Sequence, residues 1–305
     1  MNLELDSKEL NDKLNSRKYN LNMNNLINNL NNSFNLSKMF LREIIKNQNL
    51  EMYVNLKVGQ NSPLKWAFGN LIYFWNNLIL NNLGYNFLRL SDVYDPFKTK
   101  YDSIFKCQLI DCFTLINNFD LILSKITNHI VHYDVLPYID SYLIKLGLIN
   151  HSIQNENFLS IINSLNLNTL NINLKNYKFT PFKNEMIDVP EGNFLQGCNS
   201  GFYFDNEYPS FVNRVSNFSI SKYCITNYEY LNFVESGGYR THDYWLREGW
   251  KWRSNNKINN PVYWKFDTKE NIWLEKTFGE YNRLKLNDPV KHISYYEASA
   301  YCKWA

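Results

Sequence analysis

The spacing of apolar residues changes once along this chain, and the change divides it into two parts. From about residue 20 to residue 165, apolar residues recur every three or four positions, as an amphipathic helix requires. The clearest runs are Leu26, Leu30 and Phe34; Leu64, Phe68, Leu71, Ile72 and Trp75; and Phe119, Ile122, Leu123, Ile126 and Ile130. About four such helices, packed as an antiparallel bundle, would bury these stripes.

A different pattern begins after the last helical run. Residues 166–174 alternate asparagine or threonine with leucine or isoleucine and lead towards a Thr-Pro pair, which is typical of a linker. Farther along, short alternating segments such as residues 218–223 indicate strands. We therefore predict an α+β protein with a helical bundle over residues 1–165, a linker over 166–182 and a mixed domain over 183–305.

Capping residues predict two helices inside the mixed domain. Asn227 is placed to cap a helix that stops at Gly237. Ser294 and Glu297 have the spacing of a capping box at the start of another helix.

Charge and hydropathy exclude several classes of protein. The chain has 32 basic and 29 acidic residues and no basic run, which disfavours an electrostatic surface for nucleic acid or membranes. No segment offers the roughly 20 consecutive apolar residues of a membrane helix, and the N-terminus lacks the pattern of a signal peptide. The five cysteines, an odd number at scattered positions, argue against a disulfide framework. We expect a cytoplasmic protein without a nucleic-acid or membrane partner.

The mixed domain also carries many motifs at fixed spacing. They are residues 201–207, Gly237-Gly238-Tyr239, the tryptophans and arginines between 245 and 253, and residues 261–264, 289–298 and 301–305. Together they resemble the formylglycine-generating-enzyme-like, or sulfatase-modifying-factor, domain found in non-heme-iron sulfoxide synthases of the ergothioneine and selenoneine pathways. The resemblance implies a C-type-lectin-like domain after a DinB-like helical bundle. Because the family's domain continues beyond the last motif, we expect a divergent, C-terminally truncated version that holds only its N-terminal part.

The resembled family implies a specific metal site. Three histidines of its bundle bind Fe(II), and its enzymes join a thiol or selenol to a histidine-derived betaine. Residues 66–70 match its Trp-x-x-Gly-His element, but Asn70 stands at the ligand position. The His-x-x-x-His element falls on Asn150 and Gln154, and a shift of one residue gives His151 and Asn155. Amide oxygens are weak iron ligands, so we expect no cofactor in this chain as it stands and assign no catalytic residue.

Other residues are candidates for a site. His129 and His132 lie one helical turn apart and, with Asp134 or His151, could form a relocated metal site. Trp250, Trp252 and Arg247 are candidates for the wall of a substrate cleft. Residues 94–95 and 101–103 resemble a Tyr-Asp-Ser element of the selenoneine-synthase branch, with a turn at a helix start as the alternative.

Three functions remain open at this stage. The favoured one is a divergent ergothioneine- or selenoneine-synthase-like protein that is inactive as an iron oxygenase, because ligand histidines and the C-terminal half-domain are missing. The second is an active oxygenase that forms a C–S or C–Se bond, with a rebuilt metal site or a downstream partner chain that supplies the missing half. The third is a non-catalytic ligand-binding module, and fold resemblance alone does not choose among them.

Overall fold

The computed structural model describes residues 23–46, 63–86, 88, 90–100, 109–164 and 185–305. The predicted linker at 166–182 and the Tyr-Asp-Ser element at 101–103 lie outside the described residues. The chain divides into two compact units, Met1–Ile161 and Ile162–Ala305. Helices fill the first unit, whereas the second mixes helices with small antiparallel sheets, which confirms the predicted α+β class.

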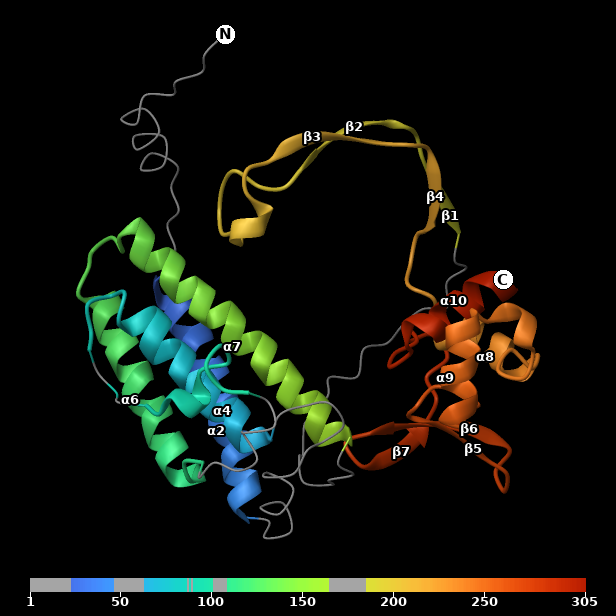
Figure 1. The fold of residues 1–305 in the computed structure, drawn as a ribbon, viewed down its shortest axis with the longest axis horizontal. Helices are drawn as coiled ribbons and strands as arrows, with labels where there is room; N and C mark the ends of the chain where they lie inside the picture. Colours follow the sequence, from blue (N-terminus) through green and yellow to red (C-terminus); the bar gives the residue numbers. More distant parts are fainter. Residues whose placement is uncertain (1–22, 47–62, 87, 89, 101–108, 165–184) are drawn as a thin grey trace. The chain divides into compact units, whose positions relative to one another are not determined.

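Long helices build the N-terminal unit (Figure 1). They are α2 (Met23–Lys46), α4 (Leu64–Tyr73), α6 (Cys112–Val131) and α7 (Tyr138–Ser164), and a π-helical segment, η1 (Phe74–Leu80), continues α4. None of the described helices is long and apolar enough to cross a bilayer.

Aromatic side chains from each of these helices form the core of the bundle. Phe34 of α2 meets the ring of Phe119 of α6 edge-on, with the centroids 5.7 Å apart. The ring of Phe68 on α4 lies 4.0 Å from that of Phe158 on α7. All four rings are fully buried. The helical spacing read from the sequence therefore identifies the faces of α2, α4 and α6 that pack together.

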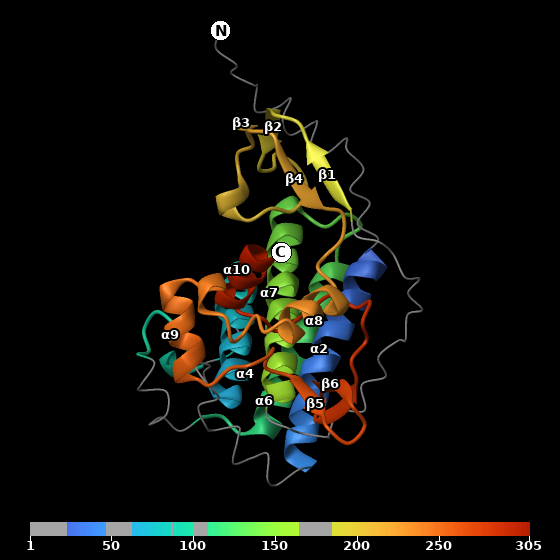
Figure 2. The ribbon, with the colours of Figure 1, turned by 90° about the vertical axis from the view of Figure 1, so that its right-hand side faces the viewer.

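Short strands and helices alternate in the C-terminal unit (Figures 1 and 2). The strands are β1 (Met186–Val189), paired with β4 (Phe218–Ser221); β2 (Gly192–Gln196), paired with β3 (Phe211–Val215); and β5 (Trp264–Asp267), β6 (Ile272–Thr277) and β7 (Glu280–Arg283), which form one sheet with β6 in the centre. The helices are α8 (Asn227–Glu235), α9 (Arg247–Asn255) and α10 (Tyr295–Trp304), with short turns η3 (Asp205–Glu207) and η4 (His242–Tyr244). All strand pairs are antiparallel.

Aromatic residues also dominate the core of this unit. The fully or nearly fully buried members of this core are Tyr230, Phe233, Val234, Tyr239, Trp245, Trp264, Leu284 and Ala300. They come from α8, α10, β5 and the loops between these elements, so the core is assembled from segments distant in sequence.

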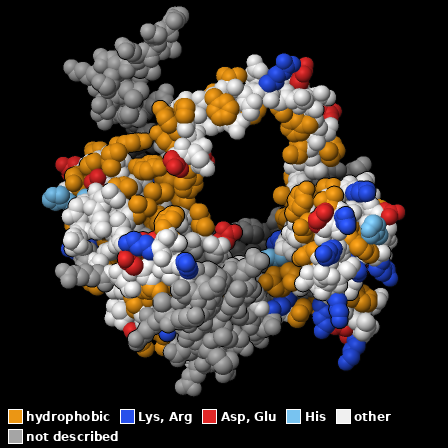
Figure 3. Space-filling view, viewed as in Figure 1, with side chains coloured by type: hydrophobic (Ala, Val, Ile, Leu, Met, Phe, Trp, Pro, Cys, Tyr) orange, Lys and Arg blue, Asp and Glu red, His pale blue; other side chains and the backbone are white. Residues whose placement is uncertain are grey.

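The ribbon of β1 and β4 has one apolar face and one mixed face, on which Met186 lies opposite Ser221. Ile187 lies opposite Ile220 on one face, whereas Asp188 lies opposite Ser219 on the other. The Ser219 hydroxyl donates to Asp188 Oδ1 at 2.6 Å. Ile187 and Ile220 are 44% and 54% exposed, and Figure 3 shows hydrophobic side chains along this part of the chain.

The structure confirms one of the two predicted helix starts and corrects the other. Ser294 and Glu297 form the predicted capping box at the start of α10. The prediction for α8 was wrong by one residue, because Thr226 caps this helix and shares a capping box with Glu229. Asn227 is already helical and donates its side-chain amide to the carbonyl of Lys285 at 2.9 Å. Thr226 and Asn227 can both cap a helix, so the sequence alone did not show which of them does.

Candidate functional site

One face of α4 carries the element predicted from the sequence to correspond to the resembled family's first metal-ligand motif. Trp66, Gly69, Asn70 and Tyr73 are spaced by three or four residues and so share this face. The Trp66 indole donates to the carbonyl of Val93 at 2.6 Å, and the Asn70 amide nitrogen donates to the carbonyl of Tyr94 at 2.8 Å. This face therefore binds the backbone of the short helix η2 (Asp92–Tyr94).

Glycine is required at position 69 for this contact. A Cβ atom there would lie 2.1 Å from a ring carbon of Tyr94, closer than real side chains approach. Tyr94 is buried, and its hydroxyl accepts a hydrogen bond from the backbone N–H of Ile110 at 2.6 Å. The Trp-x-x-Gly-Asn element is thus a docking surface for residues 93 and 94.

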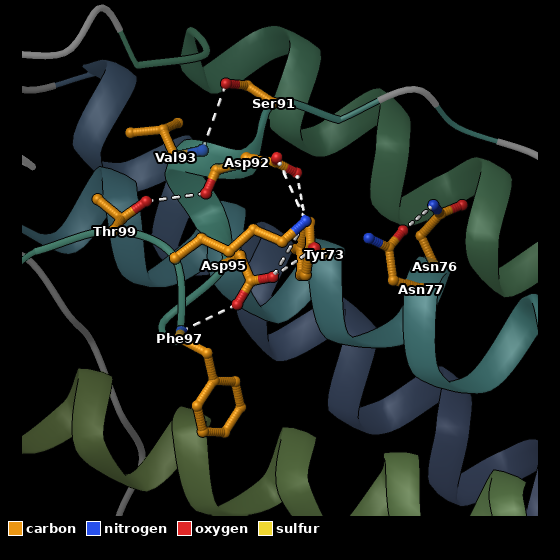
Figure 4. A network of polar contacts seen from close by, with 10 residues as sticks. Tyr73, Asn76, Asn77, Ser91, Asp92, Val93, Asp95, Phe97 and Thr99 are labelled. Atoms are coloured by element: carbon orange, nitrogen blue, oxygen red, sulfur yellow. Dashed lines mark hydrogen bonds and ion pairs between the residues drawn. The ribbon is translucent and has the colours of Figure 1, made fainter.

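A polar network extends this docking surface to Asp95 (Figure 4). The Tyr73 hydroxyl donates to Asp95 Oδ2 at 2.9 Å, and the backbone N–H of Phe97 donates to Asp95 Oδ1 at the same distance. The hydrogen bond from Phe97 lowers the pKa of Asp95 below its usual range, with further help from Tyr73 and Lys98. Burial, followed by the hydrogen bond to Asp95, raises the pKa of Tyr73. Asp95 is therefore a charged hydrogen-bond acceptor that holds the loop after η2 against Tyr73 of α4.

On α7, the predicted ligand positions and the buried positions differ by one residue. Asn150 and Gln154 are half-buried. The neighbouring residues His151 and Asn155 are 0% and 4% exposed. Successive residues of a helix are rotated by about 100°. The structure therefore turns the shifted pair, His151 and Asn155, into the bundle core.

His151 belongs to a chain of hydrogen bonds with a defined direction. The Trp75 indole N–H, which can only donate, is 3.0 Å from His151 Nδ1, so this nitrogen is an acceptor. A neutral ring then carries its proton on Nε2, which lies 2.9 Å from Ser37 Oγ. The Ser37 hydroxyl donates to Asn155 Oδ1 at 2.5 Å, and the Asn155 amide donates to the carbonyl of Ser33 at 2.9 Å. Burial lowers the pKa of His151 to about 3.

The histidines of the predicted relocated site lie in unlike surroundings. His129 is buried, with Nδ1 3.0 Å from the Tyr85 hydroxyl and Nε2 2.7 Å from Asp140 Oδ2. His132 is exposed, and its ring meets that of Tyr133 edge-on. Both ring nitrogens of His129 and of His151 are therefore engaged in hydrogen bonds. Across the described residues, no three His, Cys, Asp or Glu side chains are grouped so that they could hold a metal ion.

In the C-terminal unit, only one of the three residues predicted for the wall of a substrate cleft lines the pocket described here. Trp252 lines a pocket of about 510 Å³ at the start of α10. The other lining residues are Lys257, Ile258, Asn259, Asn260, Val262, His292, Ile293, Ser294 and Glu297. Trp250 instead packs against Trp245 and lies under the guanidinium of Arg253, 5.1 Å from the ring centre. Arg247 is exposed at the first turn of α9.

Sequence reasoning missed a buried hydrogen-bond network beside this pocket. The Tyr239 hydroxyl donates to Glu297 Oε1 at 2.6 Å and lies 3.2 Å from the Tyr230 hydroxyl. Glu297 Oε2 accepts from the backbone N–H of Ser294 at 2.7 Å. Burial raises the pKa of both tyrosines. Glu297 thus caps α10 and also ties it to the loop after α8, and only the first role has a signal in the sequence.

Comparison with known protein families gives a match to the C-terminal part of the chain. Residues 176–305 match the sulfatase-modifying factor enzyme 1-like domain. The C-terminal unit contains a formylglycine-generating-enzyme-like domain. This FGE-like domain carries the aromatic core, the pocket at Trp252 and the Tyr239–Glu297 network described above.

Curated relatives of this chain include both oxygenases and an inactive enzyme. The hercynine oxygenases of Mycobacterium tuberculosis and Mycolicibacterium thermoresistibile are each 34% identical, over 101 and 104 residues. These matches cover 33% and 34% of this chain but only 23% and 22% of the relatives. The inactive Cα-formylglycine-generating enzyme 2 of Mus musculus is 28% identical over 130 residues, 39% of this chain and 42% of that protein. The chain therefore spans less than a quarter of the hercynine oxygenases and less than half of the inactive enzyme.

Proposed function

We propose that this protein is a non-catalytic relative of the hercynine oxygenases, with a DinB-like bundle whose ligand positions stabilise the fold instead of binding iron. The observation that carries the proposal is the hydrogen bond from the Asn70 amide to the carbonyl of Tyr94. At the position where the resembled family has a histidine ligand, this side chain holds the η2 segment. We also propose that this protein belongs to the ergothioneine or the selenoneine branch of the resembled family.

The donor set at these positions does not fit Fe(II). Asn70 uses its amide nitrogen as a donor, which leaves one neutral amide oxygen. Asn150 and Gln154 offer amides as well, and iron in this family is expected to need imidazole. His151, the one imidazole on this part of α7, already engages both of its nitrogens. We therefore derive no iron-dependent step for this chain.

Iron loading tests the proposal. After anaerobic incubation with Fe(II) and desalting, elemental analysis should find well under one iron per chain, and assays with hercynine and a thiol or selenol should give no sulfoxide or selenide. The variant Asn70→His, Asn150→His, Gln154→His should bind iron at least about tenfold more tightly, since imidazole ligands replace amides.

A matched control adds three histidines elsewhere in the bundle. Asn29, Asn82 and Asn117 are exposed asparagines on or beside these helices. Their triple change to histidine should leave iron binding at the level of the unmodified protein. Stoichiometric iron in the unmodified chain would refute the proposal and support an active oxygenase with a rebuilt metal site.

Ligand binding without turnover is a second candidate function, and the pocket at Trp252 favours it. The pocket combines one aromatic wall with the apolar side chains of Ile258, Val262 and Ile293. A betaine carries a quaternary ammonium group, which an aromatic face attracts.

Calorimetry with hercynine tests this role. Trp252→Leu should weaken binding by about tenfold, the loss expected for one desolvated cation–π contact. Trp250→Leu removes the same type of side chain outside the pocket and should change affinity by less than about twofold. Equal effects of the two changes would exclude this pocket as the site.

A further inference from the structure

In the N-terminal unit, the side chains of Tyr85 and Asp140 both form hydrogen bonds to the ring of His129. Tyr85 lies in the turn after η1, His129 in the last turn of α6 and Asp140 in the first turn of α7. His129 Nε2 is 2.7 Å from Asp140 Oδ2, and His129 Nδ1 is 3.0 Å from the Tyr85 hydroxyl. The His129 side chain is 7% exposed and the Asp140 side chain 20%, so solvent competes weakly for this hydrogen bond.

The carboxylate of Asp140 fixes the direction of both hydrogen bonds. An ionised carboxylate only accepts, so His129 Nε2 must carry a proton. In the neutral ring, Nδ1 then has a free electron pair and accepts from the Tyr85 hydroxyl. The arrangement is a relay of acid, imidazole and hydroxyl, with the same roles as in a catalytic triad and a tyrosine as the last member.

A cation lies beside the Tyr85 ring. Lys125, one helical turn before His129 on α6, places its ammonium group 5.6 Å from the centre of the Tyr85 ring. A cation beside the ring attracts charge that develops on the phenol. Tyr85 is half-buried, so part of its side chain is open to solvent.

We propose that Tyr85 is a nucleophile activated by His129 and Asp140, and that it accepts an acyl group from small activated esters. The phenolic proton moves to His129 Nδ1 while Tyr85 Oη forms a bond to the carbonyl carbon. The bond from this carbon to the leaving group breaks, and the leaving group departs with the electron pair and takes the proton from His129. The products are an acylated Tyr85 and a free alcohol, and Asp140 stabilises the imidazolium in between.

Acetylation by p-nitrophenyl acetate at neutral pH tests the proposal, with peptide mass spectrometry measuring the rate at each tyrosine. Tyr138 and Tyr228, which are 52% and 55% exposed, serve as internal controls. Tyr85 should react at least about tenfold faster than either, because general-base assistance contributes at least that much. Reaction of Tyr85 at the same rate as these more exposed tyrosines would overturn the proposal.

Two variants separate activation from structure. Asp140→Asn keeps the shape of the side chain but removes its charge, and should lower the Tyr85 rate by about tenfold or more without changing the rates at Tyr138 and Tyr228. Tyr85→Phe should abolish the fast acetylation and leave the rates at the other tyrosines unchanged. Circular dichroism confirms that each variant is folded. A folded Asp140→Asn protein with an unchanged Tyr85 rate would show that the cluster only joins the three elements.

Discussion

The N-terminal unit should lose stability steadily as the pH falls from about 6.5 towards 3, because folding holds His151 neutral. Its ring is fully buried, and burial lowers its pKa from 6.5 to about 3. In the unfolded chain the same histidine takes up a proton near its ordinary pKa. Below that pH the unfolded state binds one more proton than the folded state, so acid favours unfolding.

The expected size of this effect is large for a single residue. Each unit of pH between the two pKa values costs about 1.4 kcal/mol, which gives on the order of 4–5 kcal/mol over the whole interval. Above about pH 6.5 the contribution of His151 to stability is fully present, and below about pH 3 no more is lost. Urea unfolding at a series of pH values, followed by circular dichroism, measures the slope.

The variant His151→Gln separates this residue from other titrating groups. Glutamine stays neutral, can accept from the Trp75 indole and can donate to Ser37, so the hydrogen-bond chain retains a partner at this position. We expect the variant to be less stable at neutral pH by about 1–3 kcal/mol, since the replacement fits the core less well. The slope of its unfolding free energy against pH, below about pH 6.5, should correspond to about one proton fewer than the slope of the unmodified chain. Identical slopes would contradict the assignment.

The sequence predicted the fold better than it predicted which residues lie inside the bundle. Helical spacing is a local property, so it identified the runs that contain Phe34, Phe68 and Phe119. On α7 two registers were open, and family spacing favoured Asn150 and Gln154 over His151 and Asn155. The structure buries the second pair, because Ser37 and Trp75 supply polar partners far away in sequence.

The same limit explains the other residues that sequence reasoning missed. Asn70 was recognised by its position in a motif, but its partner is a backbone carbonyl, which leaves no pattern of side chains to read. His129 was considered with His132, its neighbour on the helix, whereas the structure pairs it with Tyr85 and Asp140 from other elements. Motif spacing identifies which residues share a helix face, and tertiary packing decides what that face meets.

Gly147→Ala on α7 should destabilise the bundle by about 2–3 kcal/mol, although alanine in a helix is normally better than glycine by about 1 kcal/mol. A Cβ atom at this position would lie 2.4 Å from two ring carbons of Trp75. Trp75 is itself fully buried, so the ring is enclosed by the bundle core and cannot swing out to solvent freely. Overpacking must then shift α7 or force the indole out of its rotamer. Chemical denaturation measures the loss, and Gly192→Ala, where a Cβ meets nothing within 4 Å, is the control.

The reduction of Trp75 to leucine should relieve this clash and so identify its cause. Trp75→Leu alone leaves a cavity and removes the hydrogen bond to His151, so it destabilises the bundle by itself. In that background Gly147→Ala should cost about 1–3 kcal/mol less than in the unmodified chain, the range of coupling measured between residues in contact. Additive effects of the two changes would show that the glycine serves another purpose. Gly147 and His151 lie one turn apart on α7 and both meet Trp75, so the indole that excludes a side chain at position 147 is also the one that donates to the buried imidazole.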